Sequence, residues 1–260
     1  MEKITVPKPK RLKKYSIIIL VTGLILGSAW FAGFNIAEVF LKLYKGGRLL
    51  GRMFLPPNFS YIPKIVNPML QTIQMAIVGT FIGALVALPT AVLAANNFIK
   101  TKWLHIPLRV ILNIFRTIPA MVLASLFVAI FGLGAFSGVV ALAIFTFGLI
   151  SKLTFETIEA IDYGQVEALM SLGANKMNVL RYAIMPQILP QFLSYTIYGF
   201  EVNIRAAAVL GWVGAGGIGQ TLETNLAWRN FDNVGMIIIF SFVIVLIIDL
   251  ISSAIRKRLV

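Results

Sequence analysis

The segment Glu167–Gly173 reads E-A-L-M-S-L-G and lies between two long apolar runs, with Pro186 thirteen residues beyond its glycine. Four of the ten acidic residues of the chain fall within twelve consecutive positions around its start: Glu156, Glu159, Asp162 and Glu167. Carboxylates are costly in the hydrocarbon of a bilayer. We therefore expect the chain to leave the membrane at this polar segment and to re-enter it afterwards.

The composition places the rest of the chain in a membrane. Of 260 residues, 58% are hydrophobic and 13% are charged, and the mean hydropathy is +0.88. A soluble domain carries about 25% charged residues, and about 20 apolar residues are needed to cross a bilayer. Six runs qualify, at approximately 16–34, 68–95, 117–136, 137–155, 187–210 and 234–255. These runs predict an all-α polytopic membrane protein with six transmembrane helices. The chain has no cysteine and hence no disulfide framework.

The formal net charge is +13. The positions of the basic residues indicate how the chain is oriented in the membrane and do not indicate nucleic-acid binding. Basic residues precede the first run and follow the last: Lys3, Lys8, Lys10, Arg11, Lys13 and Lys14, then Arg256, Lys257 and Arg258. Basic flanks stay in the cytoplasm, so both termini should be cytoplasmic, with Lys100, Lys102 and Arg109 on the same side. The expected order is a basic N-terminus (1–15), a retained first helix (16–34), an extracytoplasmic segment (35–67) and a transmembrane core (68–258) with a cytoplasmic loop (156–181).

Two segments have an unusual charge pattern. Segment 35–67 should lie outside, yet it carries five basic residues against Glu38, namely Lys42, Lys45, Arg48, Arg52 and Lys64. It is either an amphipathic stretch on the outer surface or a basic vestibule that attracts anions.

The second is Leu108–Arg116, which places Arg109, Asn113 and Arg116 on one helical face. An arginine at the bilayer centre costs roughly 2.5–3.5 kcal/mol on insertion scales. We therefore expect an interfacial helix here, a third span that begins near Thr117 with Pro119 in its first turn, and no contact of Arg116 with substrate.

The polar segment itself predicts two short helices. Its apolar residues recur at helical spacing: Val166, Leu169, Met170, Gly173, Met177 and Leu180. Gly173 suits the left-handed conformation that ends a helix, and Asn175 can cap the next one. The result is either a compact knob that enters a groove on a partner or an ordinary polar loop packed on its own bundle.

The same residues resemble the cytoplasmic coupling loop of ABC importer permeases. Glu167, Ala168, Gly173 and Pro186 match its pattern, whereas Leu169, Ala183 and Met185 depart from it. Further segments resemble the phosphonate-type permeases, and together they cover roughly 68–258: Met69–Ile73, Arg116–Pro119, Phe145–Gly148, Met185–Pro190, Phe200–Arg205 and Val209–Gly219.

This resemblance implies a type I ABC permease fold in the bacterial inner membrane. It implies contact with an ATPase subunit through Glu167, Ala168, Leu169, Met170, Gly173, Met177 and Pro186. ATP and Mg belong to that ATPase, and no cofactor is bound by this chain. The other partners are an extracytoplasmic solute-binding protein and a second copy of the chain. The implied substrate is phosphonate, phosphate or phosphite, and the alternative is methionine or another small solute.

Two features of the fifth run have both a structural and a functional interpretation. Glu201 and Arg205 stand at i and i+4 and predict either an ion pair that orients helices or an arginine on the path of an oxyanion. The glycine-rich Val209–Gly219 lacks the strand and the Gly-Lys-Ser/Thr ending of a P-loop. Its glycines are expected to allow close backbone packing or to form part of an outer gate: Gly214, Gly216, Gly217 and Gly219.

Other function classes find little support. The chain has one histidine, His105, and no cluster at metal-ligand spacing, so neither a metal site nor an enzyme is expected. An ion-coupled secondary transporter needs carboxylates near the midplane or inverted repeats. The chain offers one such carboxylate and no detectable repeat.

Overall fold

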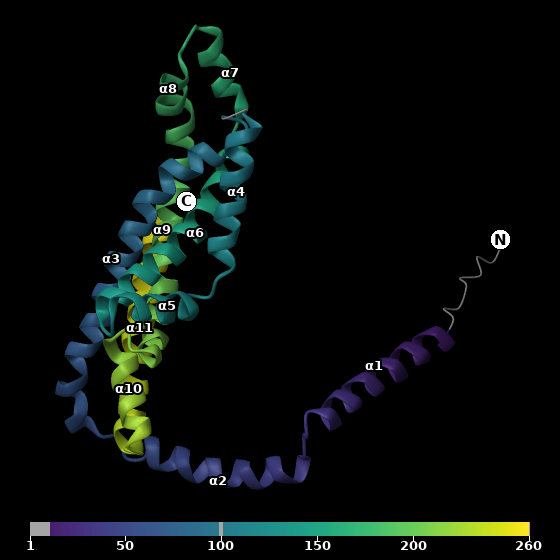
Figure 1. The fold of residues 1–260 in the computed structure, drawn as a ribbon, viewed down its shortest axis with the longest axis vertical. Helices are drawn as coiled ribbons and strands as arrows, with labels where there is room; N and C mark the ends of the chain where they lie inside the picture. The colour runs from purple at the N-terminus through teal and green to yellow at the C-terminus, as the bar shows by residue number, and fades with distance from the viewer. Residues whose placement is uncertain (1–10, 99–100, 260) are drawn as a thin grey trace, which may run out of the picture. The chain divides into compact units, whose positions relative to one another are not determined.

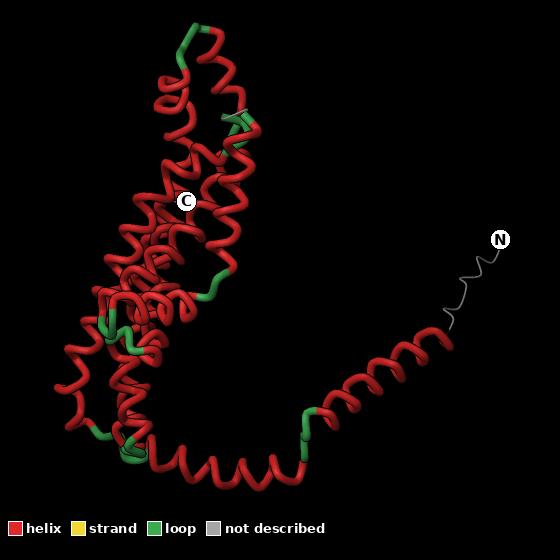
Figure 2. Tube along the Cα trace, in the orientation of Figure 1, coloured by secondary structure: helices red, strands yellow, loops and turns green. Residues whose placement is uncertain are grey.

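The computed structural model describes residues 11–98 and 101–259, which form helices and no strand (Figures 1 and 2). Lys3, Lys8, Lys10 and Lys100, and with them most of the basic N-terminus, lie outside the described residues. The chain divides into two compact units, Met1–Arg52 and Met53–Val260. Each unit is described separately.

The first unit contains α1 (Arg11–Phe31) and most of α2 (Ile36–Phe54). The apolar part of α1, Tyr15–Phe31, is shorter than the long spans of the second unit. α2 is amphipathic. On it Lys42 pairs with Glu38 at 2.7 Å, and the Arg48 guanidinium lies 4.8 Å from the centre of the Tyr44 ring. The surface stretch and the basic vestibule both stay predictions for this segment.

Three helices of the second unit are long and apolar enough to cross a membrane alone: α3 (Ile62–Ala94, preceded by the short turn η1, Phe59–Tyr61), α6 (Ala135–Glu159) and α11 (Phe231–Leu259). Small residues bring α3 and α6 together, as is usual for membrane helices. A Cβ atom on Gly83 would lie 2.7 Å from the Ala143 carbonyl oxygen. The two backbones are therefore in direct contact.

Two further spans are broken helices. α4 (Lys102–Thr117) and α5 (Ala120–Phe131) meet at 90°. After α7 (Tyr163–Ser171), a continuous helical run contains α8 (Lys176–Val179), the π-helical η2 (Leu180–Ile184), α9 (Met185–Leu210) and η3 (Gly211–Val213). α10 (Gly217–Ala227) then turns away by 44°. Among the described residues, three of the six expected runs correspond to straight helices that can span alone and two to bent pairs that are long enough only together. The first run corresponds to α1, and six spans stays a prediction.

The expectation that the helix carrying Arg116 lies on the membrane surface is wrong. α4 runs beside α6 (Figure 1), its Leu112 is fully buried, and the Phe115 ring contacts the Phe147 ring edge-on at 5.9 Å. α5 has 12 residues, or about 18 Å of helix, which cannot cross about 30 Å of hydrocarbon alone. This run is therefore long enough to cross only together with α4, and Thr117 marks the break between the two helices.

A buried polar cluster joins three helices at the level of that break. The Asn203 amide on α9 donates to the Thr80 hydroxyl on α3 at 2.8 Å and to the Thr146 hydroxyl on α6 at 2.6 Å. All three side chains are buried. Such hydrogen bonds between membrane helices fix both register and orientation.

Candidate functional site

The polar segment follows a joint between the ends of α3 and α6 and the middle of α4. The Glu159 carboxylate at the end of α6 accepts hydrogen bonds from the Arg109 guanidinium of α4 and, at 2.8 Å, from the Asn96 N–H just after α3. The Arg109 Nε also donates to the Ala94 carbonyl at 2.8 Å. This joint ties the C-terminal ends of α3 and α6 to the middle of α4, next to the polar loop.

The first residues of the loop are tied to the following span. The Asp162 carboxylate caps α7 by accepting from the Gly164 N–H at 3.0 Å. The Asp162 N–H donates to the Gln187 side-chain oxygen at 3.1 Å, and the Gln187 amide donates to the Ala183 carbonyl at 2.8 Å. A displacement of α7 would therefore pull directly on the start of α9.

The turn after α7 forms as the sequence predicts. Gly173 has φ +78, and the Ala174 N–H donates to the Leu169 carbonyl at 3.1 Å, which closes the end of α7. The Asn175 side chain accepts from the Asn178 N–H at 2.8 Å and caps α8. Both predicted helix ends are confirmed.

The apolar residues of the loop divide into two sets. Val166 and Val179 are buried against the bundle, and Leu169 and Leu180 pack partly against the same cluster. Three others remain exposed, namely Met170 at 50%, Leu172 at 82% and Met177 at 68%. One set therefore fixes the loop to its own bundle, and the other, which we call the apolar tip, has half or more of each side chain exposed.

Leu172 was not among the expected coupling residues. Its position immediately before Gly173 offered a signal, because a side chain at a turn between two short helices has few neighbours to cover it. The structure places it at the most exposed point of the apolar tip.

The four acids of the segment have different roles. Glu156 pairs with Lys152 at 2.6 Å, Glu159 binds Arg109, and Asp162 caps α7. Glu167 is exposed and makes no ion pair with any residue that the structure describes. Among the four, Glu167 is therefore the acid free to meet a partner.

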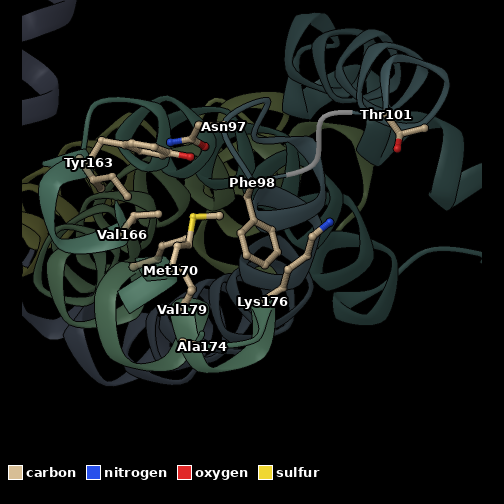
Figure 3. A pocket seen from close by; sticks show the side chains of 11 residues that line it. Asn97, Phe98, Thr101, Tyr163, Val166, Met170, Ala174, Lys176 and Val179 are labelled. Carbon is tan, nitrogen blue, oxygen red and sulfur yellow. The ribbon is translucent and has the colours of Figure 1, made fainter. Parts of the chain in front are cut away.

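A cavity of about 260 Å³ lies beside α7 (Figure 3). The side chains of Phe98, Val166, Met170 and Val179 line it, and the Lys176 side chain extends alongside Phe98. Met170 thus borders both this hollow and the exposed apolar tip. On this side, the polar loop is therefore separated from the rest of the bundle by a cavity.

Pro186 explains the π-helical turn before it. A proline lacks the backbone N–H and its ring presses on the carbonyl of the residue four positions earlier, here Tyr182. In η2 the backbone N–H groups donate to the carbonyl five residues earlier instead of four, as the Met185 N–H does to the Leu180 carbonyl. The wider turn accommodates the ring, so the helix continues from α8 into α9 without a kinked break.

The expected ion pair between Glu201 and Arg205 does not form. Glu201 is 4% exposed and binds Arg256 of α11 through both carboxylate oxygens, at 2.8 and 3.1 Å. Arg205 lies 3.5 Å from Asp249, also of α11, and both of these side chains are about half exposed. Each charge therefore pairs across helices, which ties α9 to α11 at two levels.

The glycine-rich turn between α9 and α10 is closely packed. A Cβ atom on Gly219 would lie 2.1 Å from the Ala208 carbonyl oxygen, and Gly214, Gly216 and Gly217 all have φ between +71 and +83. The Gly217 N–H donates to the Gln71 side chain of α3 at 2.9 Å. Close backbone packing is confirmed, while the role of these glycines in a gate stays a prediction.

Residues 87–260 match the family described as "Binding-protein-dependent transport system inner membrane component". The chain belongs to this family. It is the permease component of an ABC importer, a multi-pass protein of the inner membrane with the type I importer fold. This confirms the fold class and the membrane location that the coupling-loop resemblance implied.

Two relatives align with almost the whole chain. The phosphite transport system permease PtxC of Stutzerimonas stutzeri is 35% identical over 241 residues, which are 93% of this chain and 88% of that protein. The phosphate-import permease PhnE of Mycolicibacterium smegmatis is 34% identical over 98% of this chain, and the chain spans 48% of that longer relative.

Two solved transporters share the fold. The inward-facing MetNI methionine ABC transporter has a TM-score of 0.66 at 22% identity and covers 78% of this chain and 99% of its own. An amino acid ABC transporter crystallised with histidines has a TM-score of 0.65 at 25% identity, over 76% of this chain and 95% of its own. Membership of this family implies an ATPase and a solute-binding protein as partners.

Proposed function

We propose that this permease moves a phosphorus oxyanion, namely phosphonate, phosphite or phosphate, into the cell. The observation that carries the proposal is the 35% identity with a phosphite permease across 93% of the chain. The similarity to the methionine transporter is lower, at 22% identity, and supports the fold alone. Methionine or another small solute is the second candidate.

The ATPase contact is proposed at the tip of the coupling loop. An apolar tip of Met170, Leu172 and Met177, flanked by the unpaired Glu167, has the character of an interface core with a charged rim. Ala168 has a small side chain and Gly173 has none, so neither blocks access of a partner to the apolar tip. Pro186 and the Asp162–Gln187 hydrogen bonds connect it to α9. In this proposal ATP and Mg bind the partner, and this chain carries out no catalysis.

Two copies of the chain are proposed to form the pathway. One coupling loop engages one ATPase subunit, and a symmetric pair of loops matches a two-subunit ATPase with a two-fold axis along the pore. The Mycolicibacterium relative is about twice as long as the part that aligns with this chain, which leaves room in it for a second unit. A solute-binding protein is proposed to deliver the anion from outside.

Growth complementation tests the substrate class. The permease, produced together with its own ATPase and binding protein, is placed in cells that lack uptake of phosphite, phosphate and methionine. The proposal expects growth when phosphite, a phosphonate or phosphate is the sole phosphorus source. Rescue of a methionine auxotroph on limiting methionine, without rescue on any phosphorus source, would establish the second candidate instead.

A further inference from the structure

α2 has a basic face and an apolar face on opposite sides of the helix. At 3.6 residues per turn, its basic residues fall within about 120° of one another around the helix axis: Lys42, Lys45, Arg48 and Arg52. Phe40, Leu43 and Leu50 lie on the opposite side, and these side chains are 68%, 63% and 55% exposed. A helix with Lys and Arg on one face and Phe and Leu on the other is typical of segments that lie in the membrane–water interface.

The basic face has too few carboxylates to neutralise it. Glu38 is the acidic residue of α2, and it pairs with Lys42 at 2.7 Å. Lys45, Arg48 and Arg52 form no ion pair with the described part of the chain, and Arg48 donates to the Tyr44 hydroxyl at 2.8 Å. Arg48 and Arg52 also stand at i and i+4, where like charges destabilise a helix. The basic face therefore favours an anionic partner outside this chain.

Both ends of α2 are expected at the outer surface of the membrane. α3 ends at the joint beside the polar loop, so its start, which follows α2, lies at the opposite surface. Met53 near the end of α2 lies against Gly235 near the start of α11, where its carbonyl leaves no room for a Cβ atom. α1 is expected to cross from the cytoplasmic side. It ends with Trp30 and Phe31, which are 86% and 92% exposed, and tryptophan is typical of the interface.

A helix with both ends at one surface lies along the membrane. α2 has 19 residues, or about 28 Å of helix. If it stood upright, its ends would differ in height by almost the thickness of the hydrocarbon core, which is about 30 Å. A helix parallel to the surface turns one face toward the hydrocarbon, and only the apolar face of α2 avoids the cost of burying charge. The basic side chains then lie at the level of the phospholipid headgroups.

A vestibule for the transported anion would use only the basic face. The apolar face would then have to pack on protein, whereas Phe40 and Leu43 are more than half exposed in this chain. An anionic phospholipid matches both faces at once, because it carries acyl chains as well as a phosphate group. Arginine pairs with phosphate through two parallel N–H donors.

We infer that α2 is an interfacial helix that binds anionic phospholipid at the outer surface of the membrane. Phe40, Leu43 and Leu50 contact the acyl chains, and the basic face, above all Arg48 and Arg52, contacts the phosphate groups. The backbone contact between Met53 and Gly235 connects this surface anchor to the start of α11. The inference holds for whichever solute the permease carries.

The chain has no cysteine, so a single introduced cysteine can be labelled specifically. Leu43→Cys reports on the apolar face. Leu41→Cys, on the basic side of the helix, is the matched control, because the two leucines are 63% and 66% exposed. The full-length permease is labelled with a fluorophore and reconstituted with its ATPase in vesicles of phosphatidylcholine and phosphatidylglycerol. In one set of vesicles the phosphatidylglycerol has brominated acyl chains, which quench the fluorophore on contact, and in the other set the phosphatidylcholine has them.

We expect the label at position 43 to be quenched strongly and the label at 41 weakly, with brominated phosphatidylglycerol the better quencher. A basic residue near an anionic surface contributes about 1 kcal/mol, or about fivefold in association. Replacing Arg48→Gln and Arg52→Gln together should therefore lower the preference for phosphatidylglycerol about fivefold or more. Quenching at position 43 by phosphatidylcholine should remain in this double variant, which shows that α2 is still folded on the membrane.

Three results would overturn the inference. Equal quenching at positions 41 and 43 would show that α2 has no lipid-facing side. A label at 43 that neither brominated lipid nor iodide in the water quenches would show that protein covers the apolar face, either a second copy or another partner. Equal quenching by the two brominated lipids in the wild-type background would show that the basic face does not select an anionic headgroup.

Discussion

At the residue scale, neighbouring acids of the polar loop differ in the residues that they bind. Glu159 joins the ends of α3 and α6 to the middle of α4 through Asn96 and Arg109, and the side chains of its ion pair with Arg109 are about a quarter exposed. Glu167 holds nothing in the described chain. Removing one partner of a charged hydrogen bond leaves the other unsatisfied, so these acids should affect different properties.

Glu159→Gln is expected to destabilise the permease by about 1–3 kcal/mol, because Arg109 would lose its charged acceptor. Thermal unfolding in detergent measures this. Glu156→Gln is the control, since the Glu156 side chain is 51% exposed in its pair with Lys152 and such pairs contribute about 0–1 kcal/mol. Equal unfolding temperatures for both variants would contradict the role of the joint.

Glu167→Gln should leave the unfolding temperature unchanged and lower the amount of ATPase that co-purifies, together with the hydrolysis that the binding protein stimulates. The physical reason is that only a contact outside this chain is lost. Unchanged ATPase binding and unchanged coupled hydrolysis would remove Glu167 from the interface.

Arg205 remains a candidate for the pathway, since its side chain is half exposed beside Asp249. If it helps the anion cross, Arg205→Gln should assemble normally and import more slowly, and Arg205→Lys should retain more import than the Gln variant. Uptake at the wild-type rate in both variants would leave it only the role of pairing α9 with α11.

At the element scale, the turn between α9 and α10 depends on glycines at specific points. Gly219 lies against the Ala208 carbonyl, and Gly217 against the Thr72 hydroxyl, where an added Cβ would come within 2.1 and 2.5 Å. The turn carries α10 onto α3 through Gln71 and Thr72, whose side chains accept from the Gly217 and Ile218 N–H groups. α10 and α3 cannot separate without losing these hydrogen bonds.

Gly219→Ala should therefore destabilise the permease by about 1–3 kcal/mol, the usual range for overpacking. Gly46→Ala in α2 is the matched control, because nothing lies within 4 Å of its added Cβ and alanine favours a helix. Thermal unfolding of the two variants gives the comparison. A Gly219→Ala variant as stable as Gly46→Ala would show that the turn is looser than the structure has it.

At the scale of the whole molecule, local features could be predicted from the sequence and long-range pairings could not. Gly173 and Asn175 end and begin helices through their own neighbours, so spacing was enough to place them. The pair Glu201–Arg205 failed because α11 brings Arg256 and Asp249 beside α9 from about fifty residues away, and these compete with an i, i+4 neighbour.

The prediction of a helix on the membrane surface at 108–116 failed for a different reason. α4 packs along α6, which buries Leu112 and brings the Phe115 ring against Phe147. Phe147 lies about thirty residues further along the chain, so the charge pattern of α4 by itself could not reveal this contact.

ATP-driven uptake by the complete importer tests the central claim most directly. The permease and its ATPase are reconstituted into lipid vesicles with the ATPase facing the lumen. ATP is enclosed in the lumen, and labelled phosphite is added outside together with the binding protein. The account predicts accumulation that requires ATP and binding protein together and that falls when Glu167 is replaced by glutamine. Uptake driven by a proton or sodium gradient without ATP, or no uptake of any phosphorus oxyanion, would contradict it.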